Sequence, residues 1–195
     1  MYCSSNKKDL KYPKISNFFC GNLSRRTIGR MRVVLSGEKG RPVVIAGSSW
    51  PFCAFVTVPL ILVPAAIVSA LVIVPMAPTW LICVYYPWLA LVLISLFFVS
   101  CRDPGLVLHT PKPASIEDGV DRSGWVYNST VKSYRPRGAF YCHDNDVVVE
   151  KYDHFCPWTG TSIGGRNMTA FKLFVFSSNV LCYGTILIVV LVCVL

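Results

Sequence analysis

The feature that most constrains the fold of this chain is the absence of charge over two long stretches. No Asp, Glu, Lys, Arg or His occurs from Pro42 through Cys101, and none occurs from Leu173 through Leu195. A helix that crosses the hydrocarbon core of a bilayer needs about 20 apolar residues. The first stretch is therefore long enough for two membrane spans and the second for one, whereas soluble cores seldom extend so far without charge.

Prolines divide the first stretch into two candidate helices. Pro75 and Pro78 interrupt a helix and favour a turn, so we expect spans at residues 50–75, 79–101 and 171–195. Pro59 and Pro64 fall inside the first span, where membrane helices tolerate them better than soluble helices do. The expected fold class is an all-α integral membrane protein, a multi-span helical bundle. Its loop 102–170, between the second and third spans, is expected to be mostly irregular.

The distribution of basic residues predicts the orientation of these spans. Residues 1–41 carry ten Lys and Arg, residues 102–170 carry eight, and the connector 76–78 carries none. Since basic loops remain in the cytosol, the tail 1–49 and the loop 102–170 are expected there. The tail can lie against anionic headgroups or simply be kept soluble by its charge. Most of the excess charge flanks the membrane, so no nucleic-acid partner is expected.

A cluster of reactive residue types lies in the loop, within the stretch YDHFCPW from Tyr152 to Trp158. On extended backbone, His154 and Cys156 would point to one face and Phe155 to the other. His154 could then accept the proton of the Cys156 thiol, while Asp153 holds the imidazole in the required tautomer. A cluster of this kind is more often a group of surface residues than a catalytic site. Its position just before a membrane span favours a nucleophile held at the bilayer surface.

The region from Ser133 to Val175 resembles the DHHC family of protein S-acyltransferases. That family has Asp-His-His-Cys-Pro-Trp, then glycines and an Arg-Asn pair that lead into the third of four spans. The matching residues here are Asp153, His154, Cys156, Pro157, Trp158, Gly160, Ile163, Gly164, Arg166 and Asn167, with Asp103-Pro104-Gly105 after the second span and Arg135-Pro136 in the loop. The chain ends within an apolar run, and we interpret it as truncated before a fourth span.

The resemblance implies a protein S-palmitoyltransferase that works in two steps. Cys156 would be the nucleophile that takes the acyl group from palmitoyl-CoA or a similar acyl-CoA, with His154 as general base and Asp153 orienting His154. The acyl-Cys156 intermediate would then pass the chain to a cysteine of a cytosolic or membrane protein. The expected partners are acyl-CoA, cysteine-containing protein substrates and the lipid bilayer. The expected location is an endomembrane (ER or Golgi) or the plasma membrane, with the active site facing the cytosol.

The sequence departs from the family at the positions that hold two structural zinc ions. By resemblance, the eight ligand positions are Asn128, Val131, Tyr141, Cys142, Asn145, Val148, Phe155 and Ser162. Only Cys142 is a zinc ligand, whereas a structural zinc site needs four nitrogen or sulfur ligands. Structural zinc is therefore predicted to be absent. We expect Val131, Tyr141, Val148 and Phe155 to form a packed core in its place; the alternative is a loop that has lost both metal and order.

Other functions remain compatible with the sequence. The main alternative is a non-catalytic membrane scaffold of the same family, which binds partners or an acyl chain without turnover. A transporter fragment is disfavoured because charged residues commonly mark intramembrane transport paths, and here only Lys172 lies at the edge of a span. A thiol protease is conceivable, but nothing in the sequence resembles a peptide cleft.

Overall fold

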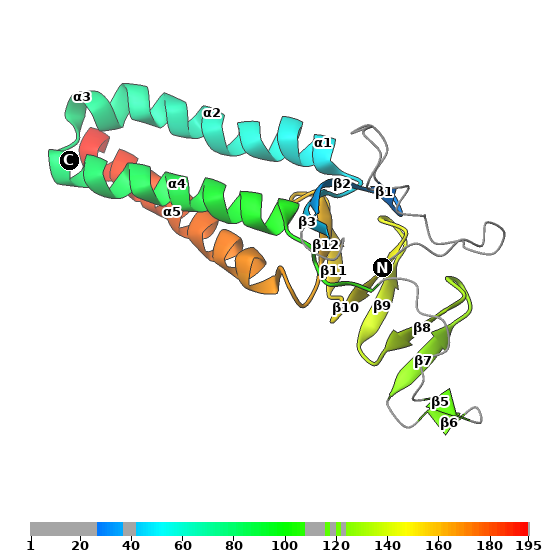
Figure 1. The fold of residues 1–195 in the computed structure, drawn as a ribbon. Coiled ribbons are helices and arrows are strands. Elements are labelled where there is room, and N and C mark those ends of the chain that lie inside the picture. The colour runs from blue at the N-terminus through cyan, green and yellow to red at the C-terminus, as the bar shows by residue number, and fades with distance from the viewer. Residues whose placement is uncertain (1–26, 37–41, 108–115, 118–119, 122–123, 195) are drawn as a thin grey trace.

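The part of the chain that the structure describes consists of three long helices and a β-rich region at one end of them (Figure 1). The computed structural model describes residues 27–36, 42–107, 116–117, 120–121 and 124–194. Three helices are long and apolar enough to cross a membrane by length and composition, namely Trp50–Met76, Thr79–Cys101 and Met168–Val192. These helices are consistent with a membrane protein. The division of the whole chain into tail, spans and loop remains a prediction.

The first long helix is continuous but alternates between α-helical and π-helical turns. Its segments are α1 (Trp50–Phe52), η2 (Cys53–Thr57), α2 (Val58–Val68), η3 (Ser69–Ile73) and α3 (Val74–Met76). Each π-helical segment ends just before a proline, Pro59 in α2 and Pro75 in α3. Proline has no N–H to donate and its ring clashes with the preceding turn, and a wider π-helical turn is one local adjustment that accommodates it. Pro75 thus lies within the helix rather than in the connector.

The connector between the first two long helices is correspondingly short. Ala77 and Pro78 both have extended backbone, and α4 (Thr79–Cys101) begins immediately afterwards. The third long helix, α5 (Met168–Val194), begins before residue 171, where the third span was expected. Figure 1 shows the three helices running side by side, with the β-rich region at the end opposite the Ala77–Pro78 connector.

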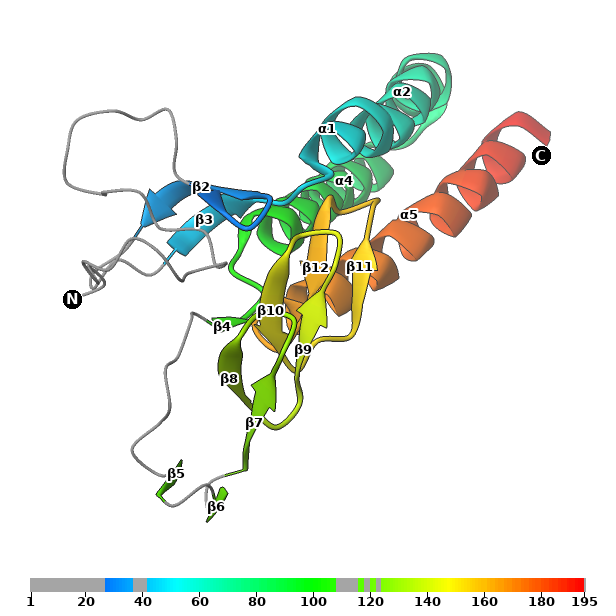
Figure 2. The same ribbon diagram turned by 90° about the vertical axis from the view of Figure 1, so that its right-hand side faces the viewer.

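The region outside the long helices consists of short antiparallel strands. Their bounds are β1 (Thr27–Ile28), β2 (Met31–Ser36), β3 (Pro42–Ala46), β4 (Leu106–Val107), β5 (Ile116–Glu117), β6 (Val120–Asp121), β7 (Trp125–Asn128), β8 (Ser133–Pro136), β9 (Ala139–Cys142), β10 (Val147–Glu150), β11 (His154–Cys156) and β12 (Thr161–Ile163). The sheets have the strand orders β1-β2-β3, β4-β10-β9, β5-β6, β7-β8 and β11-β12. Figure 2 shows β11 and β12 between the helices and strands β9 and β10.

These strands correct two sequence-based expectations, an all-α fold and a mostly irregular loop. The expectation failed because each strand is short and its pairing partner is set by turns with unusual backbone. Asp146 (φ 53°) and Gly138 (φ 78°) occupy left-handed conformations in the turns before β10 and β9, respectively. Strand β10 is covered on both faces, so Val147, Val148 and Val149 are all buried. A continuous run of apolar residues, without alternation between apolar and polar side chains, is typical of a strand buried on both faces.

Two apolar clusters hold the β-rich region together. One packs the β11–β12 hairpin against the helices, and the other packs strands of the β-rich region against one another. The first contains Cys156 and Ile163 from the β11–β12 hairpin, packed with Cys53, Val92, Leu96, Val99 and Phe174 of the helices. The second contains Ile28, Met31 and Ile45 of β1, β2 and β3, packed with Cys142, Val147 and Val149. The segment before the first long helix therefore folds onto the loop that follows α4. Such long-range packing fixes the position of β11 relative to the helix ends.

Candidate active site

The Asp153-His154-Phe155-Cys156 stretch lies on and beside an extended strand. Strand β11 pairs with β12 in the register His154 with Ile163, Phe155 with Ser162 and Cys156 with Thr161. Alternate residues of a strand point to opposite faces. His154 and Cys156 therefore share the face that meets the helices, as their contacts with Phe171 and Phe174 indicate. Phe155 packs on the other face, against the second apolar cluster.

Asp153 and His154 are in direct contact. His154 Nδ1 lies 2.7 Å from Asp153 Oδ2, and both side chains are partly exposed. A carboxylate can only accept a hydrogen bond, so the proton of this neutral imidazole is assigned to Nδ1 and Nε2 remains as a proton acceptor. The His154 ring also packs edge-on against Phe171 of α5, at 5.1 Å between centroids. The imidazole is therefore held both by a carboxylate and by an aromatic ring.

Cys156 is buried at the junction of the hairpin and the helix ends. Its exposed fraction is 7%, and its neighbours in the first apolar cluster include Cys53 and Leu96. Among the described residues the structure records no hydrogen bond from the Cys156 thiol to His154. The Asp–His pair is thus assembled, whereas the pair formed by His154 and the thiol is not. Catalytic hydrogen bonds in unliganded enzymes are often longer than in the reacting complex.

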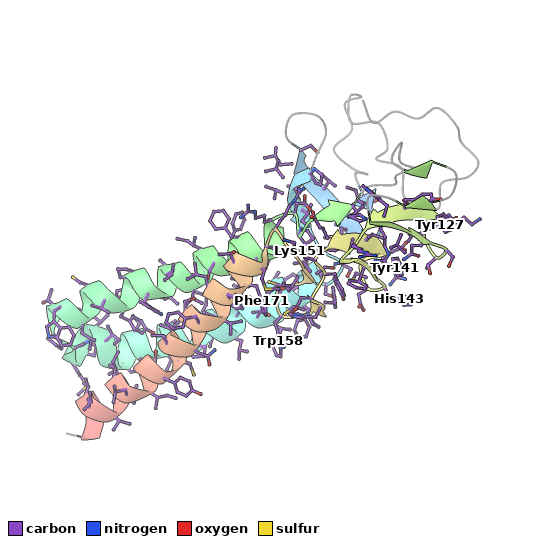
Figure 3. The ribbon with its side chains drawn as sticks, turned by 90° about the horizontal axis from the view of Figure 1, so that it is seen from below. Tyr127, Tyr141, His143, Lys151, Trp158 and Phe171 are labelled. Atoms are coloured by element: carbon purple, nitrogen blue, oxygen red, sulfur yellow. The ribbon has the colours of Figure 1, made fainter. Side chains whose placement is uncertain are left out.

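The turn after Cys156 packs tightly against the start of the first long helix. Thr57 Oγ1 donates to the carbonyl oxygen of Trp158 at 2.8 Å, and the Trp158 ring meets Phe52 edge-on at 5.3 Å. A Cβ on Gly47 would lie 2.1 Å from the carbonyl oxygen of Gly160 and 2.8 Å from Thr161 Cβ. The absence of a side chain at Gly47 therefore permits this close approach. Figure 3 shows Trp158 and Phe171 near the helix ends and Tyr127 far from them.

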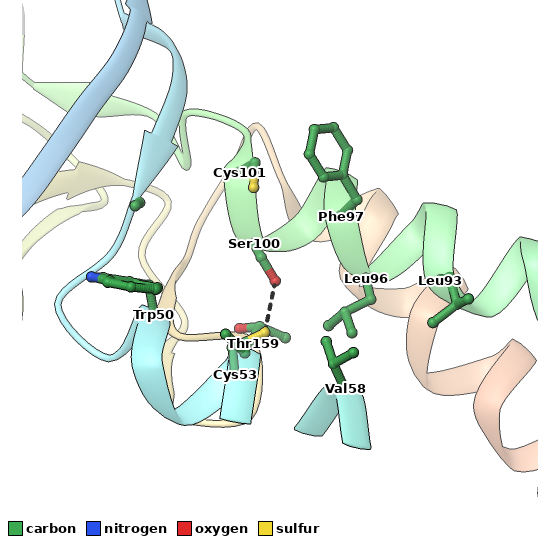
Figure 4. A pocket seen from close by; sticks show the side chains of 11 residues that line it. Trp50, Cys53, Val58, Leu93, Leu96, Phe97, Ser100, Cys101 and Thr159 are labelled. Atoms are coloured by element: carbon green, nitrogen blue, oxygen red, sulfur yellow. Dashed lines mark hydrogen bonds between the residues drawn. The ribbon is translucent and has the colours of Figure 1, made fainter. Parts of the chain in front are cut away.

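A pocket of about 280 Å³ opens beside this hairpin. It lies between the first long helix and α4, and Thr159 of the turn after Cys156 also lines it. Figure 4 shows the Cys53 thiol and the Ser100 hydroxyl facing each other across it, with Sγ and Oγ 3.6 Å apart. The remaining lining is mostly apolar and includes Val58, Leu93, Leu96 and Phe97. Because Cys53 and Leu96 also contact the cluster that contains Cys156, the pocket is next to the candidate nucleophile.

Two polar side chains hold the ends of α4 and α5 to the hairpin. Asp103 accepts hydrogen bonds from the backbone N–H groups of Gly105 and Leu106, and its other oxygen lies 2.8 Å from Arg166. The fully buried Asn167 donates to the carbonyl oxygens of Val99 and Ser162 and accepts from the N–H of Gly164. The Asp103-Pro104-Gly105 and Arg166-Asn167 motifs therefore act together, although they are far apart in sequence.

The eight positions that the resemblance aligns with zinc ligands form two separate groups. Val131, Val148 and Tyr141 pack with Ala139 in an apolar cluster, next to a turn in which Asn128 Oδ1 accepts the N–H groups of Thr130 and Val131. In the other group, Asn145 donates to Ser162 at 2.5 Å and Ser162 donates to Cys142 at 3.2 Å. Phe155 packs beside that second group. Three of the four residues expected to form one core do so, and Phe155 does not.

These two groups do not fit a metal. The first group presents apolar side chains, and the polar atoms of Asn145, Ser162 and Cys142 are engaged with one another. No group of three or more Cys, His, Asp or Glu residues converges within the part of the chain that the structure describes. A structural zinc site needs four nitrogen or sulfur ligands, and these residues do not supply them.

Asn145 joins the loop to the segment that precedes the first long helix, a role that sequence reasoning missed. Its Oδ1 accepts the N–H of Ser48 at 2.9 Å, and its backbone carbonyl accepts the N–H of Arg30 at 2.8 Å. Nearby, burial raises the pKa of the Tyr152 hydroxyl, and the hydrogen bond of this hydroxyl with Cys142 raises it further. The only sequence signal at Asn145 was that the resemblance to the DHHC family aligns it with a zinc-ligand position.

Comparison with known proteins identifies relatives of this region. The family model for the DHHC palmitoyltransferase matches residues 122–195. Probable protein S-acyltransferase 7 of Arabidopsis thaliana is 32% identical over 115 residues. The match covers 46% of this chain and 26% of that protein. Protein S-acyltransferase 8 of the same plant is 36% identical over 117 residues (47% and 29%), and palmitoyltransferase ZDHHC18-A of Danio rerio is 32% identical over 113 residues (46% and 24%).

The chain spans about a quarter of the length of these curated relatives. The matched region includes the hairpin with Asp153, His154 and Cys156 and the long helix α5 that follows it. Over residues 122–195, the chain is thus similar to the DHHC palmitoyltransferase family and to proteins named S-acyltransferases.

Proposed function

We propose that this protein is a protein S-palmitoyltransferase that forms an acyl-Cys156 intermediate. Cys156 would attack the thioester carbon of palmitoyl-CoA or a similar acyl-CoA, with the thiol proton passing to His154 Nε2. The bond between that carbon and the CoA sulfur then breaks, and the CoA thiolate takes up the proton. In the second step the thiol of a protein substrate attacks the acyl-Cys156 carbonyl and regenerates Cys156. One thioester replaces another in each step, so no nucleotide is required.

The observation that carries this proposal is the contact between Asp153 and His154 on the strand that bears Cys156. Their 2.7 Å separation supports an Nδ1-protonated imidazole, whose Nε2 is available as a base. His154 and Cys156 share one face of β11, which supports proton transfer between them once substrate is bound. The contact of Asp153 with the imidazole also supports its role in stabilising the charged ring formed during the reaction.

The apolar pocket beside Cys53 supports a site for part of the acyl chain. Its lining is mostly aliphatic and aromatic, and it adjoins the cluster that contains Cys156. Each methylene moved from water into such surroundings contributes about 0.8 kcal/mol to binding. We propose that the chain enters between the first long helix and α4, while the CoA group stays at the bilayer surface near the hairpin.

The same proposal gives the protein an orientation and partners. The tail 1–49 and the loop 102–170 lie in the cytosol, as the distribution of Lys and Arg supports. Cysteine-containing cytosolic or membrane proteins then reach Cys156 from the cytosolic side. The location is an endomembrane or the plasma membrane.

The test is acylation of the detergent- or nanodisc-embedded protein by a clickable palmitoyl-CoA analogue. Hydroxylamine should release the label from the wild-type chain, and Cys156→Ser should take up none. Cys182→Ser is the matched control, since Cys182 is an exposed cysteine of α5 that does not line the pocket, and it should retain the label. Transfer to a cysteine peptide then demonstrates turnover. Label on Cys156 without transfer would support the scaffold alternative, and label that Cys156→Ser does not affect would refute the proposal.

A further inference from the structure

One buried hydroxyl in the candidate site has no partner. Thr161 in β12 has an exposed fraction of 0%, and its Oγ1 makes no hydrogen bond within the described part of the chain. Leaving a buried hydroxyl unpaired costs free energy that a similarly shaped apolar side chain avoids. The neighbouring hydroxyls are engaged, since Thr159 bonds the Cys156 carbonyl oxygen and Ser162 bonds the Cys142 sulfur. Thr161 is therefore an exception within its own hairpin.

The register of the hairpin places Thr161 opposite the candidate nucleophile. Cys156 pairs with Thr161, whereas Phe155 pairs with Ser162. The Cβ atoms of directly opposed residues are about 4.5–5.5 Å apart and their side chains share one face. The Thr161 hydroxyl thus lies on the same face of the hairpin as Cys156 and His154. It does not bond the Cys156 sulfur in the unliganded structure, so its proton is available to another acceptor.

Acylation of Cys156 would bring a new oxygen to the face of the hairpin that carries the Thr161 hydroxyl. When Cys156 attacks a thioester, the carbonyl oxygen is two bonds from Sγ and takes on negative charge in the tetrahedral intermediate. Enzymes lower such barriers with donors fixed in advance where the charge develops, and these donors act more strongly where water is excluded. From the pairing and the missing partner, we propose that the Thr161 hydroxyl donates a hydrogen bond to this oxygen in both transfer steps. The inference rests on the proposed function, and the Thr161 proton is shared but not transferred.

A purely structural role for Thr161 predicts the same stability for Thr161→Val but a different rate of acyl transfer. Gly47 packs directly on Thr161, because a Cβ at residue 47 would meet Thr161 Cα and Cβ at 2.8 Å. If Thr161 only fills this space, valine would fill it without an unpaired hydroxyl. Thr161→Val should then be at least as stable as the wild type and equally reactive. Under the proposal, the variant should be at least as stable but slow in acyl transfer.

The experiment compares wild type, Thr161→Val and Thr161→Ser in single-turnover acylation by the palmitoyl-CoA analogue. Loss of one such donor typically slows a reaction about 10²–10³-fold, and we expect Thr161→Val to fall in this range. Thr161→Ser keeps the hydroxyl and should remain much closer to the wild-type rate. Alkylation of Cys156 by iodoacetamide forms no oxyanion, so Thr161→Val should be alkylated at the wild-type rate. Thermal unfolding of Thr161→Val should occur at or above the wild-type temperature.

Each alternative outcome is distinct. Acylation of Thr161→Val at the wild-type rate overturns the inference and leaves the proposed function intact. Equal loss of acylation and alkylation also overturns it, because Thr161 would then act on the thiol itself. A wild-type chain that takes up no label on Cys156 overturns the proposed function and this inference with it.

Discussion

At the scale of single residues, the candidate site divides into a part that is assembled and a part that is not. Asp153 and His154 already form the hydrogen bond that fixes the imidazole. Cys156 is buried among apolar side chains and has no hydrogen bond to His154 within the described residues. The thiol proton must leave Cys156 during attack on a thioester, and His154, on the same face of β11, is the base that we propose accepts it. The reactivity of Cys156 should therefore depend on His154 throughout the reaction.

This dependence predicts a graded response to substitution of the two residues. His154→Ala removes the base and should slow acylation of Cys156 by about 10²–10⁴-fold, the usual contribution of general acid–base catalysis. Asp153→Asn keeps the size of the side chain but removes its charge, so it should slow acylation less than His154→Ala does. Single-turnover labelling measures both rates. Asp144→Asn, an exposed carboxylate in the same loop, is the control and should react like the wild type; full activity of His154→Ala would contradict the assigned role.

At the scale of elements, the β11–β12 hairpin is held in place by close backbone contact with the segment before the first long helix. A Cβ at Gly47 would lie 2.1 Å from the Gly160 carbonyl oxygen, and a Cβ at Gly160 would lie 3.0 Å from the Ser49 carbonyl oxygen and Trp50 Cα, so a side chain at either position requires movement. The hairpin is also held by Thr57, which donates to the Trp158 carbonyl oxygen. Since the obstructing atoms at Gly47 belong largely to backbone, they cannot rotate away. The position of the nucleophile should thus be sensitive to changes in a segment remote in sequence.

Gly47→Ala tests this packing. Its Cβ would lie 2.1 Å from the carbonyl oxygen of Gly160, and overpacking of this kind typically costs about 1–3 kcal/mol. We expect a lower temperature of thermal unfolding and slower acylation of Cys156. Gly184→Ala in α5 is the matched control, because its Cβ would meet no atom within 4 Å. If both variants unfold at the wild-type temperature, the close approach is not a constraint on the fold.

The β9–β10 hairpin contains a titratable contact. The Tyr141 hydroxyl donates to Asp146 at 2.6 Å, and this hydrogen bond is the largest of the effects that raise the pKa of Tyr141 to about 12. Tyr141→Phe should lower the free energy of unfolding by about 1 kcal/mol at neutral pH. Because the folded-state pKa is above the unfolded value near 10, the stabilisation is complete below pH 10 and is lost as the pH rises toward 12.

Unfolding measured from pH 8 to pH 12 checks this contact. The wild type should lose stability above pH 10 more steeply than Tyr141→Phe does, so that the two converge. Tyr127→Phe, which removes a hydroxyl from an exposed tyrosine, should parallel the wild type. Parallel curves for wild type and Tyr141→Phe would show that the contact with Asp146 does not persist in solution.

At the scale of the whole molecule, we predict that the β-rich region is ordered without structural zinc. Apolar packing around Val131 and Val148 and the hydrogen bonds of Asn145, Ser162 and Cys142 occupy the corresponding positions. Structural zinc contributes about 10–16 kcal/mol in small zinc-dependent domains. Packing and buried hydrogen bonds spread over two groups must therefore replace one large local contribution.

We accordingly predict that the purified protein holds no stoichiometric zinc. Elemental analysis should find well below one equivalent, and chelators should leave the thermal unfolding temperature unchanged. Asn145→Ala, in contrast, should destabilise the fold by about 1–3 kcal/mol, because it leaves the N–H of Ser48 without its acceptor and removes the donor to the Ser162 oxygen. One or two equivalents of zinc, lost together with stability on chelation, would contradict the prediction.

The predicted orientation can be tested through a glycosylation sequence in the loop. Asn128-Ser129-Thr130 matches the acceptor pattern, and Asn128 is the last residue of β7 (Figure 2). If loop 102–170 is cytosolic, Asn128 should remain unmodified in cells, and endoglycosidase treatment should leave the size of the protein unchanged. Asn128→Gln is the control, since a shift abolished by this substitution would place the loop on the opposite side of the membrane.

The sequence alone determined some features of this protein and the tertiary structure decided others, and the difference has a physical reason. The three apolar helices follow from composition, because a long uncharged run satisfies its backbone hydrogen bonds internally in a membrane. The family relationship follows from the contiguous Asp153–Trp158 motif and its flanking glycines. The strands could not be predicted, because pairs such as Val44 with Arg102 depend on segments far apart in sequence. The separation of Phe155 from Val131 and Val148, and the position of Thr161 opposite Cys156, depend on strand register. A shift of one residue in that register would send these side chains to the other face, and only packing against the helices fixes it.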